Sequence, residues 1–307
     1  MVTILMATYN GEQYLEQQLE SLIKQTIDVR IVITDDCSTD TTYDILMKYE
    51  KAYPDIIELN KRVTNSGNAA INFFEMMKKY KDDYIMLCDQ DDVWKPDKAE
   101  KSLRKLKEME AQYGKDMPLL VHSDLCVVNE KLEVLDESYI HRVNADYSKH
   151  KLNNIIIQNT LTGATAIYNR ALADMIIGEP KYMVMHDWWL ILIASAFGEV
   201  DYIPEATIYY RQHGHNVVGS TNMRSAKYML KRFFNKQDVI RAIEETYDQA
   251  ESFMEVYGDK LSTKNKELVT QYCEIPKLTK LHRVYRIFKL NTLKNGFLRN
   301  VAYILFI

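Results

Sequence analysis

The chain has 307 residues, of which 47% are hydrophobic and 27% charged, and a net charge of −4 at pH 7. This composition is ordinary for a globular protein with a sizeable core and excludes disordered and collagen-like chains. No stretch reaches the roughly 18 to 20 apolar residues that a membrane-spanning helix needs. The four cysteines have no paired spacing, so we expect neither a zinc site nor a disulfide framework, as in a reducing cytosol.

The first 113 residues predict four successive strand and helix units. The apolar run from Val2 to Ala7 reads as a strand and not as a secretion signal, since no basic segment precedes it. Strands are expected at 30–34, 56–59 and 84–88, each followed by a helical pattern. The last of these helices is expected from Pro96 to Tyr113, with the proline in its first turn. Repeated units of this kind predict a doubly wound, mostly parallel α/β sheet.

Polar residues mark three of the four strand ends. The first strand runs into Thr8, Tyr9 and Asn10, the second into Asp35 and Asp36, and the fourth into a turn with three carboxylates, Asp89, Asp91 and Asp92. In open α/β sheets, ligands bind at the carboxyl ends of the strands. Crowded carboxylates repel one another unless a cation compensates them. Oxygen ligands on a short turn suit Mg²⁺ or Mn²⁺ that is shared with phosphate oxygens, although an isolated acidic turn is more often a solvated loop.

The pattern changes after Gly114. Short strand-like runs predict a mixed-sheet region, and a further apolar helix is expected from Trp188 to Phe197. From Thr221 onward the chain reads as helical, with a hinge at 259–263. We therefore expect a catalytic domain at 1–220, with a nucleotide-binding half at 1–113 and an acceptor half at 114–220, and a helical C-terminal extension at 221–307.

Seven motifs, taken together, carry a family resemblance. They are MATYNG, VITDDCSTDTT, NSGNAA, LCDQDDVWKPDK, NTLTGA, MHDWW and YYRQHGHN. In this order they resemble the inverting family 2 glycosyltransferases of the GT-A fold, and most of all the bacterial rhamnosyltransferase-like branch that builds cell-wall and capsular polysaccharide. The resemblance covers roughly residues 1–220.

The resemblance implies a role for individual residues. Asp187 is the expected catalytic base. The metal is expected on Asp91 and His213, with Asp92 nearby, and the acceptor on Trp188 and Trp189. The nucleotide sugar is expected on Thr8, Tyr9, Asn10, Asp36, Asn65, Gly67, Asp89 and Arg211. These roles require the acidic tip of the fourth strand and Asp187 to face each other across one cleft.

Plainer roles stay open for several of these residues. Asp187 is also suited to cap the helix that follows it. The tandem tryptophans point about 100° apart on a helix, so one of them is expected in the core. Arg211 is as well suited to a structural ion pair as to a diphosphate. Asp35 is suited to cap the turn that follows it. His215 is a second candidate for the metal or the diphosphate.

The last 31 residues form a separate electrostatic region. Residues 277–307 contain seven Lys or Arg and no acid. In Leu278 to Leu290, apolar residues share a helical face and basic residues fill the others, which suits the surface of an anionic bilayer. A helix packed on the catalytic domain or on a dimer partner is the alternative, and nucleic acid is not expected because the rest of the chain is acidic. We expect a cytoplasmic protein at the inner face of the cell membrane.

The reaction implied is transfer of a sugar, with inversion and with Mn²⁺ or Mg²⁺, from a nucleotide-diphosphate donor to a lipid-linked saccharide acceptor. By resemblance the donor is dTDP-L-rhamnose, with UDP-hexoses as the alternative. A sugar nucleotidyltransferase would need a Gly-rich, Arg-containing loop after the first strand, which MATYNGEQY lacks. A catalytically inactive nucleotide-binding protein would not need both the metal carboxylates and Asp187.

Overall fold

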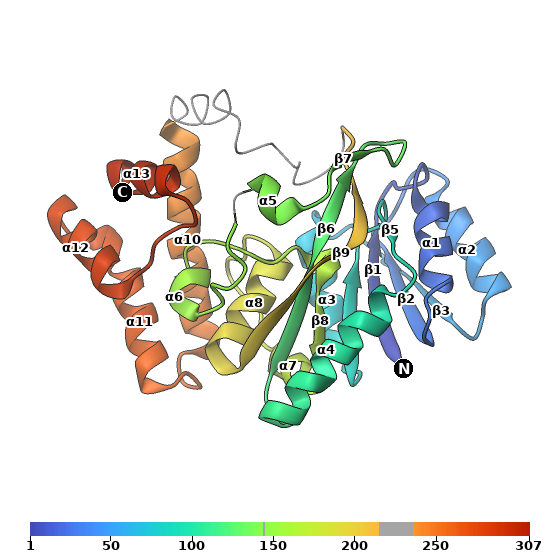
Figure 1. The fold of residues 1–307 in the computed structure, drawn as a ribbon, viewed down its shortest axis with the longest axis horizontal. Coiled ribbons are helices and arrows are strands. Elements are labelled where there is room, and N and C mark those ends of the chain that lie inside the picture. The colour runs from blue at the N-terminus through green and yellow to red at the C-terminus, as the bar shows by residue number, and fades with distance from the viewer. Residues whose placement is uncertain (144, 215–235) are drawn as a thin grey trace. The chain divides into compact units, whose positions relative to one another are not determined.

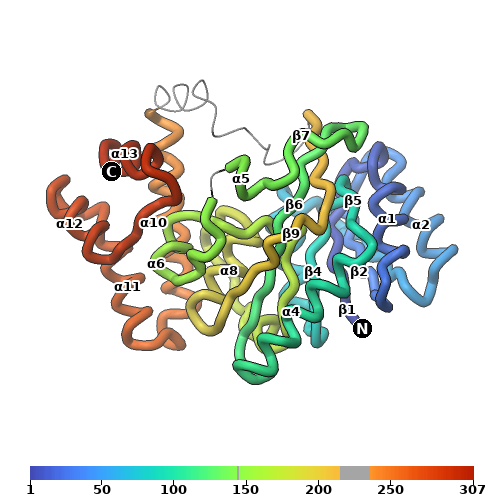
Figure 2. The backbone as a smooth tube through the Cα atoms, viewed as in Figure 1, coloured from blue at the N-terminus to red at the C-terminus, as the bar shows by residue number. Residues whose placement is uncertain are grey.

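The computed structural model describes residues 1–143, 145–214 and 236–307, and Figures 1 and 2 show the path of the chain. The contacts divide it into two compact units. Unit 1 comprises Met1–Tyr139, Leu161–Ile176 and the described residues of Glu199–Gly219, and unit 2 comprises Ile140–Thr160, Ile177–Gly198 and the described residues of Ser220–Ile307. This division differs from the single boundary expected at residue 220, because two inner segments group with the C-terminal helices.

Unit 1 is built on one sheet in which the described strands run in the order β3-β2-β1-β4-β8-β6-β9-β5, with β7 paired to β6. Its strands are β1 (Val2–Thr8), β2 (Val29–Asp35), β3 (Ile57–Lys61), β4 (Tyr84–Cys88), β5 (Val93–Trp94), β6 (Leu119–Val128), β7 (Val134–Asp136), β8 (Ile167–Asn169) and β9 (Glu199–Arg211). Its helices are α1 (Leu15–Ile23), α2 (Thr42–Ala52), α3 (Ala69–Lys79), α4 (Lys98–Tyr113), η1 (Gly163–Thr165) and α7 (Arg170–Met175).

The first four strands are parallel, as the repeated units predicted. β1 pairs with β2 and with β4, and β2 pairs with β3, all in parallel register. The chain reverses its direction across the sheet between β3 and β4, so right-handed crossovers put α3 on the face opposite α1 and α2. β8 is antiparallel to both β4 and β6, whereas β6 and β9 are parallel to each other. The expected mostly parallel α/β fold with a mixed-sheet region is confirmed.

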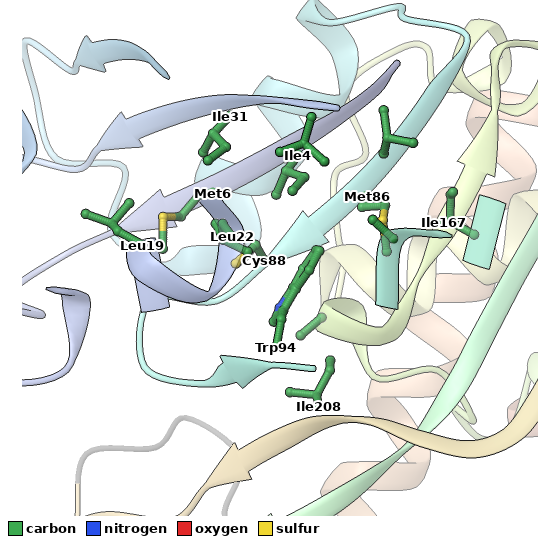
Figure 3. Close-up of a cluster of buried hydrophobic side chains, with 14 of the residues drawn as sticks. Ile4, Met6, Leu19, Leu22, Ile31, Met86, Cys88, Trp94, Ile167 and Ile208 are labelled. Atoms are coloured by element: carbon green, nitrogen blue, oxygen red, sulfur yellow. The ribbon is translucent and has the colours of Figure 1, made fainter. Parts of the chain in front are cut away.

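One hydrophobic cluster of unit 1 lies between this sheet and the helices α1 and α4. Leu15, Leu19 and Leu22 of α1 are fully buried against β1, β2 and β4, because their spacing puts them on one helical stripe. Figure 3 shows Trp94 of β5 lying between Cys88 and Ile208 of this core. The short strand β5 therefore fixes the chain that follows the acidic turn.

Two element boundaries differ from the sequence expectation. Helix α4 begins at Lys98, after Asp97, so Pro96 precedes the helix instead of occupying its first turn. The Pro96 carbonyl accepts the Thr26 N–H at 3.0 Å, which fixes this residue to the segment between α1 and β2. The predicted helix at Trp188 begins two residues earlier, at His186.

Unit 2 is helical in its described residues. It contains α5 (Tyr139–Val143, whose first residue belongs to unit 1), α6 (Leu152–Ile155), α8 (His186–Phe197), α10 (Lys236–Tyr257), α11 (Thr263–Cys273), η2 (Ile275–Lys277), α12 (Lys280–Leu290) and α13 (Phe297–Phe306). The break between α10 and α11 confirms the predicted hinge. No helix of the described ranges is long and apolar enough to cross a bilayer. All four cysteines, each within the described residues, are free thiols.

Candidate active site

The carboxyl ends of β1, β2, β4 and β9 lie at the same edge of the sheet in unit 1. β1, β2 and β4 are parallel to one another. β8 is antiparallel to both β4 and β6, so β6 runs in the same direction as β4, and β9 is parallel to β6. Thr8 and Asp35 are register partners at this edge. The edge therefore brings together the loops that follow β1, β2 and β4 with the segment that follows β9.

The loops after β1 and β2 are joined by hydrogen bonds. Asn10 has a left-handed backbone, with φ of 48°. Its amide oxygen accepts the Thr39 N–H at 2.8 Å, and its own N–H donates to the Ser38 hydroxyl at 3.0 Å. Asp35 accepts the Ser38 N–H at 3.0 Å and the Thr8 hydroxyl at 3.2 Å, which is the turn-capping role left open for it.

Asp36, the residue predicted to contact the base, is buried and already has several partners. Its carboxylate accepts the Ser66 N–H at 2.7 Å and the Ser66 hydroxyl at 2.6 Å, and it pairs with Arg62 at 3.2 Å. Asn65 donates to the Asp36 carbonyl at 2.7 Å and accepts the Gly67 N–H at 2.7 Å. Gly67 has φ of 90°, a conformation that favours glycine. The contact of these residues with a nucleotide stays a prediction.

The acidic turn after β4 is tied to the first loop by Gln90. The side-chain amide of Gln90 accepts the Tyr9 N–H at 2.8 Å and donates to the Tyr9 carbonyl at 3.0 Å, as a neighbouring strand would. Gly11 allows this approach, since a Cβ there would lie 2.3 Å from the Gln90 side-chain oxygen. Thr8 is buried, Tyr9 and Asn10 are exposed, and Asp89 is half-buried, so these four predicted nucleotide ligands lie in or beside the joined loops.

Asp91 and His213 are brought together from distant parts of the chain. Asp91 Oδ2 and His213 Nε2 are 2.8 Å apart, and the His213 ring packs on Tyr14 with 4.9 Å between ring centroids. Two adjacent ligands of a six-coordinate ion with bonds of about 2.1 Å are separated by about 3.0 Å, so this pair fits a divalent ion. Within the described ranges no group of three or more His, Cys, Asp or Glu side chains is arranged for a metal, so diphosphate oxygens or water would complete the coordination.

Asp92, the residue after Asp91, is fully buried. Its Oδ1 accepts the Arg211 backbone N–H at 3.0 Å, whereas its Oδ2 has no hydrogen-bond partner. Burial raises the pKa of the Asp92 carboxyl well above its ordinary value, and the charges of Asp91 and Asp89 raise it further. Lys98 is also fully buried, 3.8 Å above the Trp94 ring, and burial lowers its pKa to about 7. A buried carboxyl oxygen without a partner favours the protonated form of Asp92, so this residue is not counted among the metal ligands.

Arg211 holds the turn in place. It is only 1% exposed. Its guanidinium donates to the backbone carbonyl of Asp91 at 2.8 Å, to that of Glu130 at 2.5 Å and to Gln17 Oε1 at 2.6 Å, and it lies 4.5 Å above the Tyr14 ring. These three acceptors are neutral oxygens, so Arg211 has a structural role here but not through the ion pair that was the alternative. Its predicted contact with the diphosphate stays a prediction.

Asp187 belongs to unit 2, so its position relative to Asp91 stays a prediction. It lies in the first turn of α8, after the cap residue Met185, and not at the cap itself. Its Oδ1 accepts the Trp188 N–H at 2.6 Å and the Asn159 side-chain amide at 3.1 Å. A carboxylate at a helix N-terminus is stabilised by the helix dipole, and two donors fix its orientation.

The tandem tryptophans divide as their helical spacing predicted. Trp189 is completely buried and packs on Phe253 and Tyr257 of α10, which favours the core role. Trp188 is partly exposed, and its indole N–H donates to the Ile155 carbonyl at 2.7 Å. An acceptor contact therefore stays a prediction for Trp188, whereas the burial of Trp189 leaves it no face for a sugar.

Several residues of these arrangements were not among the predicted site residues, and Gln90, Asn159 and Tyr14 illustrate why. Gln90 and Asn159 stand inside motifs that the sequence singled out, so their motif membership was a signal. Tyr14 gave no signal, because an aromatic residue near a helix start is common in cores. His215, the second predicted histidine, lies outside the described residues.

Comparison with known proteins finds similar sequences among glycosyltransferases. Residues 3–114 match the model of glycosyl transferase family 2. The dTDP-rhamnosyl transferase RfbG of Shigella flexneri is 29% identical over 238 residues, which are 73% of this chain and 76% of that protein.

Two solved structures share the fold. S. aureus TarS 1-349 in complex with UDP-GlcNAc has a TM-score of 0.53 and 17% identity, covering 99% of this chain and 90% of that one. The mannosyltransferase PcManGT of Pyrobaculum calidifontis, in complex with GDP-Man and Mn²⁺, has a TM-score of 0.53 and 16% identity, covering 94% and 72%. Identities this low establish the fold and nothing finer.

Proposed function

We propose that this chain, which belongs to the family 2 glycosyltransferases and has a GT-A fold, transfers one sugar from a nucleotide-diphosphate donor to a saccharide hydroxyl with inversion. The observation that carries the proposal is the pairing of Asp91 with His213 at the sheet edge where the loops after β1, β2 and β4 meet. Ligands of open α/β sheets bind at this edge.

The donor half of the reaction belongs to unit 1. Asp91 and His213 would hold Mn²⁺ or Mg²⁺, with Arg211 and Gln90 keeping the acidic turn in place. The ion, when bound, stabilises the negative charge that develops on the leaving diphosphate. Thr8 to Asn10, Asp36, Asn65, Gly67 and Asp89 would line the nucleotide. A divalent ion is supported by the ligand types and their 2.8 Å spacing.

The acceptor half rests on Asp187. An acceptor hydroxyl is a poor nucleophile, so a carboxylate within hydrogen-bond reach must take its proton as the glycosidic bond breaks. Asn159 and the Trp188 N–H orient Asp187 Oδ1. One base is sufficient, because a single displacement with inversion needs no covalent intermediate.

The finer assignment of donor and acceptor rests on similarity. The relative in Shigella flexneri is named a dTDP-rhamnosyl transferase, which supports dTDP-L-rhamnose as the donor, and a UDP-hexose is the alternative. The acceptor we propose is a lipid-linked saccharide in cell-wall or capsular polysaccharide synthesis. The enzyme would then work at the inner face of the cell membrane.

A donor screen tests the reaction class. Hydrolysis of dTDP-L-rhamnose, UDP-glucose, UDP-GlcNAc and GDP-mannose is measured with Mn²⁺ and again with EDTA. We expect release of one nucleotide diphosphate, dependent on the ion, with dTDP-L-rhamnose as the fastest substrate. Release of pyrophosphate from a nucleoside triphosphate and a sugar phosphate would instead identify a sugar nucleotidyltransferase.

Asp187→Asn tests the base. Asn keeps a side-chain oxygen that accepts from Trp188 and Asn159, but it cannot take a proton. We expect sugar transfer to fall by about 10²- to 10⁴-fold while the donor still raises the melting temperature as in the original protein. The matched control is Asp44→Asn, which removes a carboxylate from the first turn of α2. Full transfer by Asp187→Asn would exclude Asp187 as the base.

A further inference from the structure

Exposed apolar side chains are concentrated at the end of unit 2. Of the fourteen large apolar side chains that are exposed among the described residues, six belong to α12 and α13: Leu281, Tyr285, Phe288, Phe297, Leu298 and Leu305. Scattered single residues of this kind are normal on a protein surface, but a cluster marks an interaction site.

Helix α12 has two apolar sides, and only one of them faces the protein. Ile287 is fully buried, whereas Leu281, Tyr285 and Phe288 are 82%, 65% and 56% exposed. Their spacing of i, i+4 and i+7 places the three exposed residues on one face of the helix. Exposed Lys280 and Lys289 flank this face. The sequence pattern grouped Ile287 with the outward residues, and the structure separates it from them.

Helix α13 continues the exposed surface. Its Phe297, Leu298 and Leu305 fall on one side of the helix, with Tyr303 buried on the other. The Lys280 ammonium at the start of α12 donates to the carbonyls of Leu305 and Ile307 at 2.7 and 2.8 Å. This joins the start of α12 to the end of α13, as Figures 1 and 2 also show.

We propose that the outward faces of α12 and α13 together form a docking surface for an anionic lipid bilayer, into which their apolar side chains insert. Residues 277–307 carry seven basic residues and no acid, the combination that binds such a surface. A second copy of this chain fits less well, since a symmetric contact would bring two such basic segments together. Nucleic acid would leave the six apolar side chains in water.

The linker between the two helices of the docking surface is hydrogen-bonded to residues 152–160, the segment that contains Asn159, which orients the predicted base. The linker between α12 and α13 contacts residues 152–160 twice: Asn153 donates to the Asn291 carbonyl at 2.8 Å, and the Asn295 N–H donates to Gln158 Oε1 at 2.7 Å. The residue after Gln158 is Asn159, which donates to Asp187 at 3.1 Å. Docking would thus present the acceptor side of the site to a lipid-linked saccharide, an inference that rests on the acceptor proposed above.

Vesicle sedimentation tests the docking surface. The full chain is mixed with vesicles of phosphatidylcholine and phosphatidylglycerol in a ratio of about 3:1, and with phosphatidylcholine alone. We expect binding to the anionic vesicles only, weakened by salt. The double variant Leu281→Gln and Phe288→Gln should lose affinity for these vesicles by a factor of about ten or more. The double variant Lys277→Gln and Lys289→Gln should also bind them more weakly.

Matched controls alter exposed residues elsewhere. Val63→Gln with Leu135→Gln replaces exposed apolar residues of unit 1, and Lys51→Gln with Lys115→Gln replaces exposed lysines; both should bind as the original protein does. Donor hydrolysis without vesicles should be unchanged in every variant, which separates this inference from the proposed reaction. Three outcomes would overturn the proposal. The first is equal vesicle binding by the docking-surface variants and the control variants, and the second is no binding to either kind of vesicle. The third is a dimer of the original protein that dissociates only in the Leu281 and Phe288 variant.

Discussion

The contact between Asp91 and His213 has two physical interpretations, which respond differently to a metal ion. At 2.8 Å the two side chains either share a proton or lie at the spacing of adjacent metal ligands. A proton-sharing pair gains nothing from Mn²⁺. A ligand pair is stabilised by it, and this stabilisation adds to that of the nucleotide through linkage.

Asp91→Asn separates the two interpretations. Asn still reaches His213 but brings no charge to an ion, so we expect dTDP with Mn²⁺ to raise the melting temperature no more than dTDP with EDTA does. Affinity for the ion should fall about 10- to 100-fold. The control is Asp116→Asn, at an exposed carboxylate. An undiminished, Mn²⁺-dependent shift in Asp91→Asn would remove this residue from the metal site.

Lys98 predicts a pH dependence of stability. Burial lowers its pKa to about 7, below the value of about 10.4 expected in the unfolded chain. Between these values the unfolded state binds more protons, so this contribution to the free energy of unfolding rises with pH. Lys98→Met removes a buried amine without a hydrogen-bond partner and keeps its volume.

We expect Lys98→Met to be more stable than the original protein by about 1 to 4 kcal/mol at pH 7, with a smaller gain as the pH approaches 10. Urea unfolding at several pH values measures this. A loss of stability at neutral pH would indicate instead that the ammonium offsets the charge of Asp92.

Features set by local spacing were more predictable from the sequence than contacts between remote segments. The acidic turn after β4 follows from residue type, and the division of the two tryptophans follows from helical spacing, whereas the role of Asp187 stays a prediction. The engagement of Arg211 could not be predicted, because its partners Gln17, Asp91 and Glu130 come from three separate segments. Spacing along the chain contains no information about such a meeting point.

At the scale of elements, the loops after β1 and β4 act as one piece because Gln90 pairs with the Tyr9 backbone. Gly11→Ala tests this. The added Cβ would lie 2.3 Å from Gln90 Oε1, so the paired loops must separate. We expect a loss of about 1 to 3 kcal/mol in the free energy of unfolding and weaker nucleotide binding.

Gly214→Ala is the matched control for this substitution, because a Cβ there meets no atom of the described residues within 4 Å. The double variant Gly11→Ala with Gln90→Ala removes the clash together with the pairing. It should recover stability but not nucleotide affinity. Equal nucleotide affinity in all three variants would show that the pairing of the two loops does not shape the site.

Element type was predicted better than element length. The first four strands follow from short apolar runs, but β6 and β9 are longer than the short strand-like runs that the sequence predicted after Gly114. Their pairing shifts register near Asp124, and bulges of this kind interrupt the alternation from which strands are recognised. Pro204 lies inside β9, and a proline in a sequence usually indicates that a strand ends or lies at an edge.

At the scale of the whole molecule, the two units divide the proposed chemistry. Unit 1 contains Asp91 and the nucleotide loops, and unit 2 contains Asp187 and the basic helices. The sequence placed the boundary at residue 220 because the motifs end there. It missed that 140–160 and 177–198 pack with the C-terminal helices, since such grouping depends on contacts between remote segments, such as Trp189 with Phe253.

Hydrogen exchange of the full chain tests this division. Nucleotide binding suppresses only the local openings of the segments that it stabilises. With dTDP and Mn²⁺ at about 100 times the dissociation constant, exchange should slow by up to about a hundredfold at residues 9–12, 36–42 and 89–92, and remain unchanged in α10 and α11. Similar protection of α10 and α11 would contradict the assignment of the nucleotide to unit 1.

Amide exchange at the start of α8 tests whether Asp187 faces the donor sugar. If Asp187 faces the sugar of the bound donor, the amides around it should be protected by the intact nucleotide sugar and not by the nucleotide diphosphate alone, because only the sugar reaches the acceptor side. Asp187→Asn, which keeps the local hydrogen bonds but loses the charge, should show the same pattern. Identical exchange at 186–190 with either ligand would place the base away from the donor and leave the displacement without its proton acceptor.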